Sequence, residues 1–106
     1  MPKMMIKASY NPDGVRGLMK EGASARVTAV KNLVEGIGGR VEGFYFAYGD
    51  ADAYLIVDVP DESSGIALSM AVNASGAVRL STIPLISAEQ MDAACKKTVA
   101  YRAPGA

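Results

Sequence analysis

A central segment from Arg40 to Asp61 constrains the fold of this 106-residue chain more than any other part of it. The segment contains two apolar stretches joined by the short acidic turn Tyr48-Gly-Asp-Ala-Asp52. These stretches predict strands at about 41–48 and 53–59, and so short a linker between two strands favours an antiparallel hairpin. We therefore expect a β-hairpin near the middle of a single domain, since a chain of this length has the usual size of one domain.

Further elements are predicted on both sides of the hairpin. Strands are expected at 4–10 and 77–86, because both stretches are apolar and end at turn residues. A short helical turn is expected at 15–21. A longer amphipathic helix follows at 24–37, with Ser24 as its cap and Gly38-Gly39 at its end. Helices are also expected at 63–75 and, after the capping-box pattern from Ser87 to Gln90, at about 88–97.

The resulting order, β-α-β-β-α-β-α, predicts a ferredoxin-like α+β fold. Two right-handed β-α-β crossovers that share one antiparallel sheet place the fourth, first, third and second strands side by side in that order. Both crossover helices then cover the same face of the sheet. We expect residues 1–97 to form the domain and residues 98–106, which include Pro104 and Gly105, to form a C-terminal tail.

The other face of this sheet is the main clue to assembly. The sequence leaves two registers open for each strand. In the favoured one, the residues that point toward the helices are Ile6, Ala8, Leu55, Val57, Val78 and Leu80. The opposite face then carries Met5, Lys7, Ser9, Asp52, Tyr54, Ile56, Asp58, Arg79, Ser81 and Ile83. The second strand adds either Phe44, Phe46 and Tyr48 or Gly43, Tyr45 and Ala47. Such a face is too apolar to be left in water and too charged for an ordinary core, so we predict a sheet-to-sheet homodimer around a cavity with paired polar groups.

Composition excludes several functional classes. The chain has no histidine and one cysteine, Cys95, so it lacks the residues for a Ser-His-Asp or Cys-His nucleophile and for an internal disulfide. Without histidine the usual ligand sets for zinc, iron and haem are also missing, and we predict no cofactor and no metal. Cys95 beside Lys96 and Lys97 could be an activated thiol, but a small apolar helix residue is the favoured interpretation.

Charge and hydropathy bear on the partners. The formal net charge is zero, whereas nucleic-acid-binding proteins usually have a basic excess or patch, so we predict no nucleic-acid partner. An RNA-binding sheet of this topology would also require a basic surface. No apolar run approaches the length that spans a bilayer, and the N-terminal residues resemble a strand more than a signal peptide. We therefore expect no membrane partner and a cytoplasmic location.

Several short segments, taken in order, resemble the GYD-domain family. They are Ile6-Lys-Ala-Ser-Tyr10, Gly14-Val-Arg-Gly-Leu-Met-Lys-Glu-Gly22, Gly38-Gly39, Phe44-Tyr-Phe-Ala-Tyr-Gly-Asp50 and Val57-Asp-Val-Pro-Asp61. The resemblance covers about residues 3–92 and implies a ferredoxin-like unit of the dimeric α+β barrel group, in which two sheets pack face to face. Family members often have a tyrosine between the two acids of the turn. This chain has Ala51 there, so it lacks the side chain for any chemistry that depends on that tyrosine.

The candidate site residues lie on the predicted open face and in the acidic turn. We expect Asp52, Tyr54 and Lys7 to be catalytic, because carboxylates and tyrosines can move protons and a lysine can stabilise an anion. Arg79, Ser9, Tyr48 and Asp50 are the expected substrate-binding residues. The alternatives are structural: turn formation for the two aspartates, core or interface packing for the tyrosines, and, for the two cations, either pairing with Asp52 or Asp58 or exposure at a sheet end. The acids could also bind a hard cation.

Two hypotheses for function follow. The first is a homo-oligomeric α+β barrel that binds a small anionic organic ligand and acts as a cofactor-independent oxygenase or isomerase, by analogy with other proteins of this barrel group. The second is a non-enzymatic module for ligand sensing or oligomerisation, with its cavity filled by side chains. Fold analogy alone is a weak basis for choosing a reaction.

Overall fold

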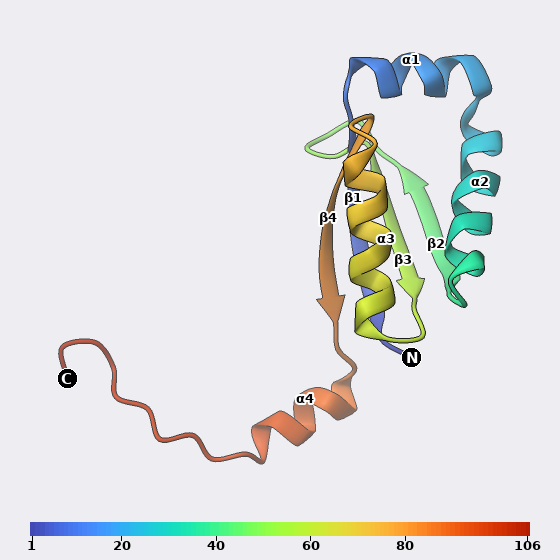
Figure 1. Cartoon of the computed structure of the whole chain (residues 1–106). Helices are drawn as coiled ribbons and strands as arrows, with labels where there is room; N and C mark the ends of the chain where they lie inside the picture. The colour runs from blue at the N-terminus through green and yellow to red at the C-terminus, as the bar shows by residue number, and fades with distance from the viewer.

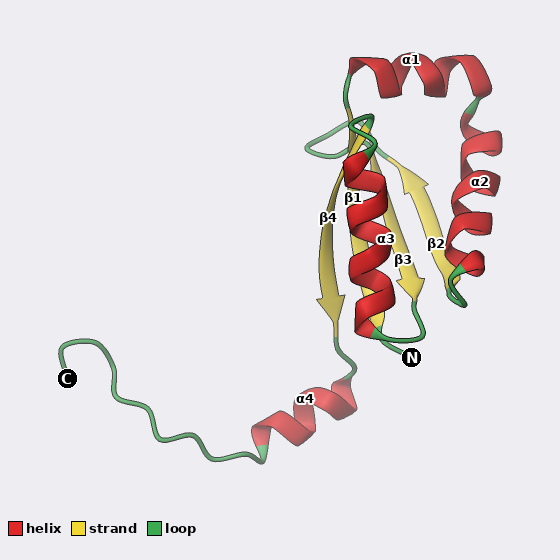
Figure 2. Cartoon of the chain, viewed as in Figure 1, coloured by secondary structure: helices red, strands yellow, loops and turns green.

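A computed structural model describes all 106 residues and contains one four-stranded sheet and four helices (Figures 1 and 2). The elements, in chain order, are β1 (Lys3–Tyr10), α1 (Pro12–Glu21), α2 (Ala23–Gly36), β2 (Arg40–Phe46), β3 (Ala53–Asp58), α3 (Glu62–Ala74), β4 (Val78–Leu85) and α4 (Ala88–Cys95). This confirms the predicted ferredoxin-like α+β fold.

The sheet has the strand order β2-β3-β1-β4, and every neighbouring pair is antiparallel. In Figure 2, α3 lies in front of the central strands, α2 runs beside β2, and α1 crosses the top. The predicted strand order is therefore confirmed. Because β1 and β3 are the central strands, a side chain on either one has a strand neighbour on both sides.

The hydrophobic core lies between the sheet and its helices. Strand residues Met4, Ile6, Ala8, Leu55, Val57 and Val78 are buried there together with Val34 of α2 and Leu68 of α3. The predicted helix-facing register of β1, β3 and β4 is thus confirmed, with Leu80 partly buried. Only 13 of the 106 residues are buried in the isolated chain, so this core is small and association would add to it.

The structure also decides the register of β2. Phe44 pairs with Leu55 and therefore faces the helices, whereas Tyr45 pairs with Tyr54 and faces the other side of the sheet. The register shifts between Val41 and Gly43, where Glu42 forms a bulge. Of the two alternatives for this strand, the one with Gly43 and Tyr45 on the open face is correct.

Three local predictions need correction. Ser24 does not cap α2, because Gly22 at φ 90° is the residue before the helix and Ser24 already lies inside it. The first helix begins earlier than predicted, at Pro12, where the Asn11 side chain accepts a hydrogen bond from the Gly14 N–H at 2.8 Å. Strand β2 ends at Phe46, so Tyr48 belongs to the following loop and not to the strand.

The C-terminal arm, residues 86–106, runs away from the sheet (Figure 1). It contains α4, which starts with the predicted Ser87–Gln90 capping box and has no buried residue. The radius of gyration of the chain is 17.0 Å, against about 13 Å for a compact domain of this length. The difference follows from the arm, which lies outside the compact part of the molecule.

Candidate functional site

The open face, defined as the side of the sheet opposite α1–α3, carries the candidate site at one end. Lys7 of β1 lies between Tyr54 of β3 and Ser81 of β4, and Tyr54 in turn lies opposite Tyr45 of β2. Directly opposed residues in an antiparallel pair have their Cβ atoms about 4.5–5.5 Å apart. The structure therefore brings together two of the three residues predicted to be catalytic, Lys7 and Tyr54.

The next pair toward the end of the sheet consists of Ser9 on β1 and Arg79 on β4, which lie opposite each other. Both were predicted to bind substrate, and both share the open face with Lys7. Neither Lys7 nor Arg79 forms an ion pair within the chain. Pairing of these two cations with Asp52 or Asp58 is therefore wrong for the isolated chain, whereas the other structural alternative, exposure at a sheet end, holds for Arg79.

Asp52, the third predicted catalytic residue, lies just before β3 and extends the ladder between β3 and β1. Its backbone N–H donates to the Ala8 carbonyl at 2.8 Å, and its Oδ2 atom accepts a hydrogen bond from the Tyr10 N–H at 2.8 Å. The Asp52 carboxylate thus accepts, at the end of the strand, a hydrogen bond of the kind that a backbone carbonyl of the neighbouring strand accepts. Asp52 thus has a structural role at the end of this ladder.

The acidic turn itself is open to solvent. Tyr48 is fully exposed and Asp50 is exposed, so these two predicted substrate-binding residues do not meet Lys7 or Arg79 within one chain. Between the two acids Ala51 is 2% exposed. The position between the two acids is therefore filled by a small buried side chain.

An apolar row of residues crosses all four strands two residues closer to the start of β1 than Lys7. Gly43, Ile56, Met5 and Ile83 are paired in sequence from β2 to β4. Ile56 and Met5 are half-buried, and Ile83 is exposed at the edge. An apolar band across an uncovered sheet indicates a contact surface.

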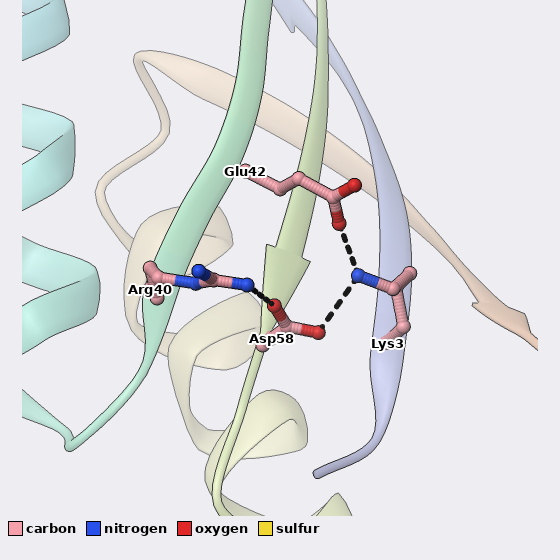
Figure 3. A network of polar contacts seen from close by, with 4 residues as sticks. All are labelled: Lys3, Arg40, Glu42 and Asp58. Atoms are coloured by element: carbon pink, nitrogen blue, oxygen red, sulfur yellow. Dashed lines mark hydrogen bonds and ion pairs between the residues drawn. The ribbon is translucent and has the colours of Figure 1, made fainter.

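A cluster of four charges closes the other end of the open face (Figure 3). Asp58 lies 2.9 Å from Arg40 Nη2 and 3.0 Å from Lys3 Nζ, and Lys3 also contacts the carboxylate of Glu42. Asp58 is 7% exposed, while its two cationic partners reach it from the solvent side. Each charge faces an opposite charge, so the cluster is electrically balanced and joins β1, β2 and β3.

The cluster shifts the pKa values of its members. Hydrogen bonds from Arg40 and then Lys3 hold the pKa of Asp58 below its ordinary value of 3.8. The Glu42 and Asp58 carboxylates raise the pKa of Lys3, and Asp58 raises that of Arg40. Sequence reasoning placed Asp58 on this face but did not identify its partners, because the bulge at Glu42 sets which side chains of β2 can reach it.

Two general features complete the description of the site. No group of three or more acidic, cysteine or histidine side chains is placed to hold a metal ion. None of the helices has the length and apolar character needed to cross a bilayer.

These features define the chain as a ferredoxin-like α+β protein with one covered and one uncovered sheet face. Comparison with protein families gives a match to the GYD domain over residues 5–95, and the chain belongs to that family. Comparisons with curated proteins and with solved structures found no match. The resemblance inferred from the sequence is thereby confirmed at the level of the family.

Proposed function

We propose that the protein is a homodimer in which the open faces of two sheets pack together. The apolar row of Met5, Ile56 and Ile83 supports this assembly, since it crosses a face that no helix of the chain covers. The small core of the isolated chain supports it as well. Burying apolar surface stabilises an assembly by roughly 25 cal/mol per Å² removed from water, less the cost of association.

The C-terminal arm is a second feature that a dimer explains. Its large apolar side chains Ile86, Met91, Val99 and Tyr101 are between 50% and 79% exposed. The arm leaves β4, an edge strand, and its own chain provides no core for it. In the proposed dimer, the arm of one protomer packs on the other protomer.

The proposed activity is binding of a small organic anion at the Lys7 end of the open face. The observation that carries this proposal is the contrast between two sets of cations on one face. Lys3 and Arg40 are paired with carboxylates, whereas Lys7 and Arg79 have none. Closing a second sheet over two unpaired cations would be costly unless an anion accompanies them. A carboxylate or enolate of the ligand fits that need.

The chemistry that fits this arrangement is proton abstraction from a carbon acid. A base, either Asp52 or a tyrosine such as Tyr54, takes the proton, and the C–H electron pair remains on the substrate as an enolate. Lys7 and Arg79 then stabilise the negative charge that develops on the enolate oxygen. Ser9 would orient the substrate, and Tyr48 and Asp50 would contribute from the turn once assembly brings them close. A cofactor-independent isomerase or oxygenase uses an enolate of this kind.

A non-enzymatic role is the second candidate, and one observation favours it. The Asp52 carboxylate accepts a backbone hydrogen bond from Tyr10, so the best candidate base already serves the fold. In this alternative the barrel senses a ligand or joins subunits, and the Lys7 end only binds.

Exchange of the methyl protons of pyruvate for deuterium, followed by NMR in D₂O with the full-length protein, tests the enzymatic proposal. We expect exchange above the buffer rate, and loss of most of that excess in both Lys7→Met and Arg79→Met. Arg16→Met, on the exposed side of α1, is the matched control and should exchange as the unmodified protein does. Saturable pyruvate binding without exchange would favour the binding-only alternative, and the absence of both would contradict a site for small keto acids.

A further inference from the structure

A second recess lies on the covered side of the sheet, away from the proposed Lys7 site. Its outer part, of about 510 Å³, lies between α1, α2 and α3, with polar groups at Tyr10, Asp13, Glu21, Arg26 and Ser75. Its inner part is a narrow cavity of about 40 Å³ between α2, α3 and the sheet. The two parts share the wall residues Tyr10, Arg26, Leu33, Val72 and Val78, so they adjoin along these side chains.

Arg26 lies at the junction of the two parts and lacks partners. Its Nε atom is buried and makes no hydrogen bond, and its guanidinium group forms no ion pair. A buried donor without an acceptor costs about 1–3 kcal/mol, so native structures rarely leave one in place without a reason. The nearest acids of the recess are otherwise placed: Asp13 pairs with Arg16, and Glu21 has no ion pair with Arg26.

The lining of the inner cavity defines the rest of the ligand. Twelve of its 13 lining residues are hydrophobic, and Arg26 is the exception. A cavity of about 40 Å³ accepts only a few water-sized groups, since each group needs about 10–15 Å³. It therefore suits the last few carbons of a short aliphatic chain and not a branched lipid with two chains.

We propose that this recess binds a short-chain aliphatic monocarboxylate. The carboxylate pairs with the Arg26 guanidinium and accepts the hydrogen bond of its Nε, and the alkyl chain enters the cavity between α2 and α3. Asp13 and Glu21 at the outer recess repel a dianion more strongly than a monoanion, which favours a monocarboxylate over a phosphate. This site lies on the opposite side of the sheet from the Lys7 site and does not depend on the function proposed there.

Hexanoate is the probe that tests this inference, in ¹H–¹⁵N NMR titrations of the full-length protein. We expect saturable shifts at Arg26, Val30 and Val72, and at least tenfold weaker binding in Arg26→Gln. Arg102→Gln, which changes an exposed arginine on the C-terminal arm far from the recess, should bind hexanoate as the unmodified protein does. Hexanol, which has the same chain without the charge, should bind weakly and equally to the unmodified protein and to Arg26→Gln.

Leu33→Trp provides a second test, which does not depend on how well Arg26→Gln folds. Leu33 is 42% exposed and lines both parts of the recess. Leu33→Trp should fill the mouth of the cavity and weaken hexanoate binding at least fivefold, and it adds a fluorescent reporter to a chain that has no tryptophan. Lys7→Met should leave hexanoate binding intact. Shifts confined to the open face, equal affinity in Arg26→Gln, or no saturable binding at millimolar hexanoate would each overturn the proposal.

Discussion

Arg40 Nη2 lies 2.9 Å from Asp58 Oδ2, and this contact fastens the edge strand β2 to the central strand β3. The same carboxylate holds Lys3 of β1 on its other oxygen at 3.0 Å. One side chain thus links three adjacent strands at the end where β1 begins and β3 ends (Figure 3). Because Asp58 is nearly buried and its partners are not, removing Asp58 should matter more than removing either cation.

Asp58→Ala should lower the free energy of unfolding by about 1–3 kcal/mol, since a hydrogen bond to a charged group contributes about that much to stability. Lys3→Gln and Arg40→Gln should each cost less than Asp58→Ala, because each leaves Asp58 one partner and removes a largely exposed charge. Urea denaturation of the three variants checks this order. Equal losses for all three would show that the cluster does not depend on its buried member.

The low pKa of Asp58 predicts acid sensitivity. A carboxyl whose pKa is lower in the folded state than in the unfolded state stabilises the fold above its unfolded value, and this stabilisation is lost as the pH falls through the folded value. Unfolding free energy should therefore decrease below about pH 4, starting near the ordinary value of 3.8. Asp58→Asn should have a flatter acid limb in denaturation curves measured from pH 5 to pH 2.

Asp61 requires a control in that experiment, because its pKa is also lowered, by the hydrogen bonds from Ser64 and Ser63 at the start of α3. Asp61→Asn keeps a good capping side chain but removes the titration. Combining it with Asp58→Asn should flatten the acid limb further. An unchanged acid limb in the double variant would mean that other carboxyls dominate the response.

A close contact between Gly14 of α1 and the start of β4 gives a third prediction. A Cβ atom on Gly14 would overlap the Ala77 carbonyl oxygen, whereas a Cβ on Gly17, one turn further along α1, meets nothing within 4 Å. Gly14→Ala should therefore destabilise the protein by about 1–3 kcal/mol, as overpacking does. Gly17→Ala should stabilise it by about 0.5–1 kcal/mol through its better helix propensity. Thermal unfolding of the matched pair measures both signs.

The apolar row predicts how the dimer can be broken. Ile56→Lys places a charge in the middle of the open face and should raise the dimer dissociation constant at least 100-fold. Ile66→Lys, on the exposed side of α3, makes the same chemical change outside the proposed interface and should leave association unchanged. Sedimentation equilibrium distinguishes the two. A dimer that survives Ile56→Lys but not Ile66→Lys would place the interface on the helices.

The arm predicts an effect of truncation. Ending the chain at Ser87 removes α4 and the tail, which contribute no residue to the core. The shortened protein should keep its far-UV circular dichroism, apart from the loss of one short helix, and should dissociate more readily than the full-length dimer. Unchanged dimer affinity in sedimentation would show that the arm does not pack on the partner.

Much of the fold could be predicted from local patterns. Alternating apolar residues in 53–58 placed Leu55 and Val57 toward the helices, and the Ser87–Gln90 pattern placed the start of α4, because both signals depend on residues close in sequence. The start of α2 was misplaced at Ser24. Its true boundary depends on the positive φ of Gly22, which the packing of α1 against α2 supports.

The candidate site, like the fold, was predicted only in part from the sequence. Sequence alone determined that Lys7 and Ser9 share one face of their strand, because a strand alternates its side chains with a period of two. Tyr54 and Arg79 joined them in the favoured of two registers, which the structure confirms. Only the tertiary structure decided that Arg40 and Lys3 neutralise Asp58 while Lys7 and Arg79 remain unpaired, and that Arg26 faces an apolar recess. Those facts depend on the bulge at Glu42 and on the distance between α2 and α3, which arise from contacts between segments far apart in the chain.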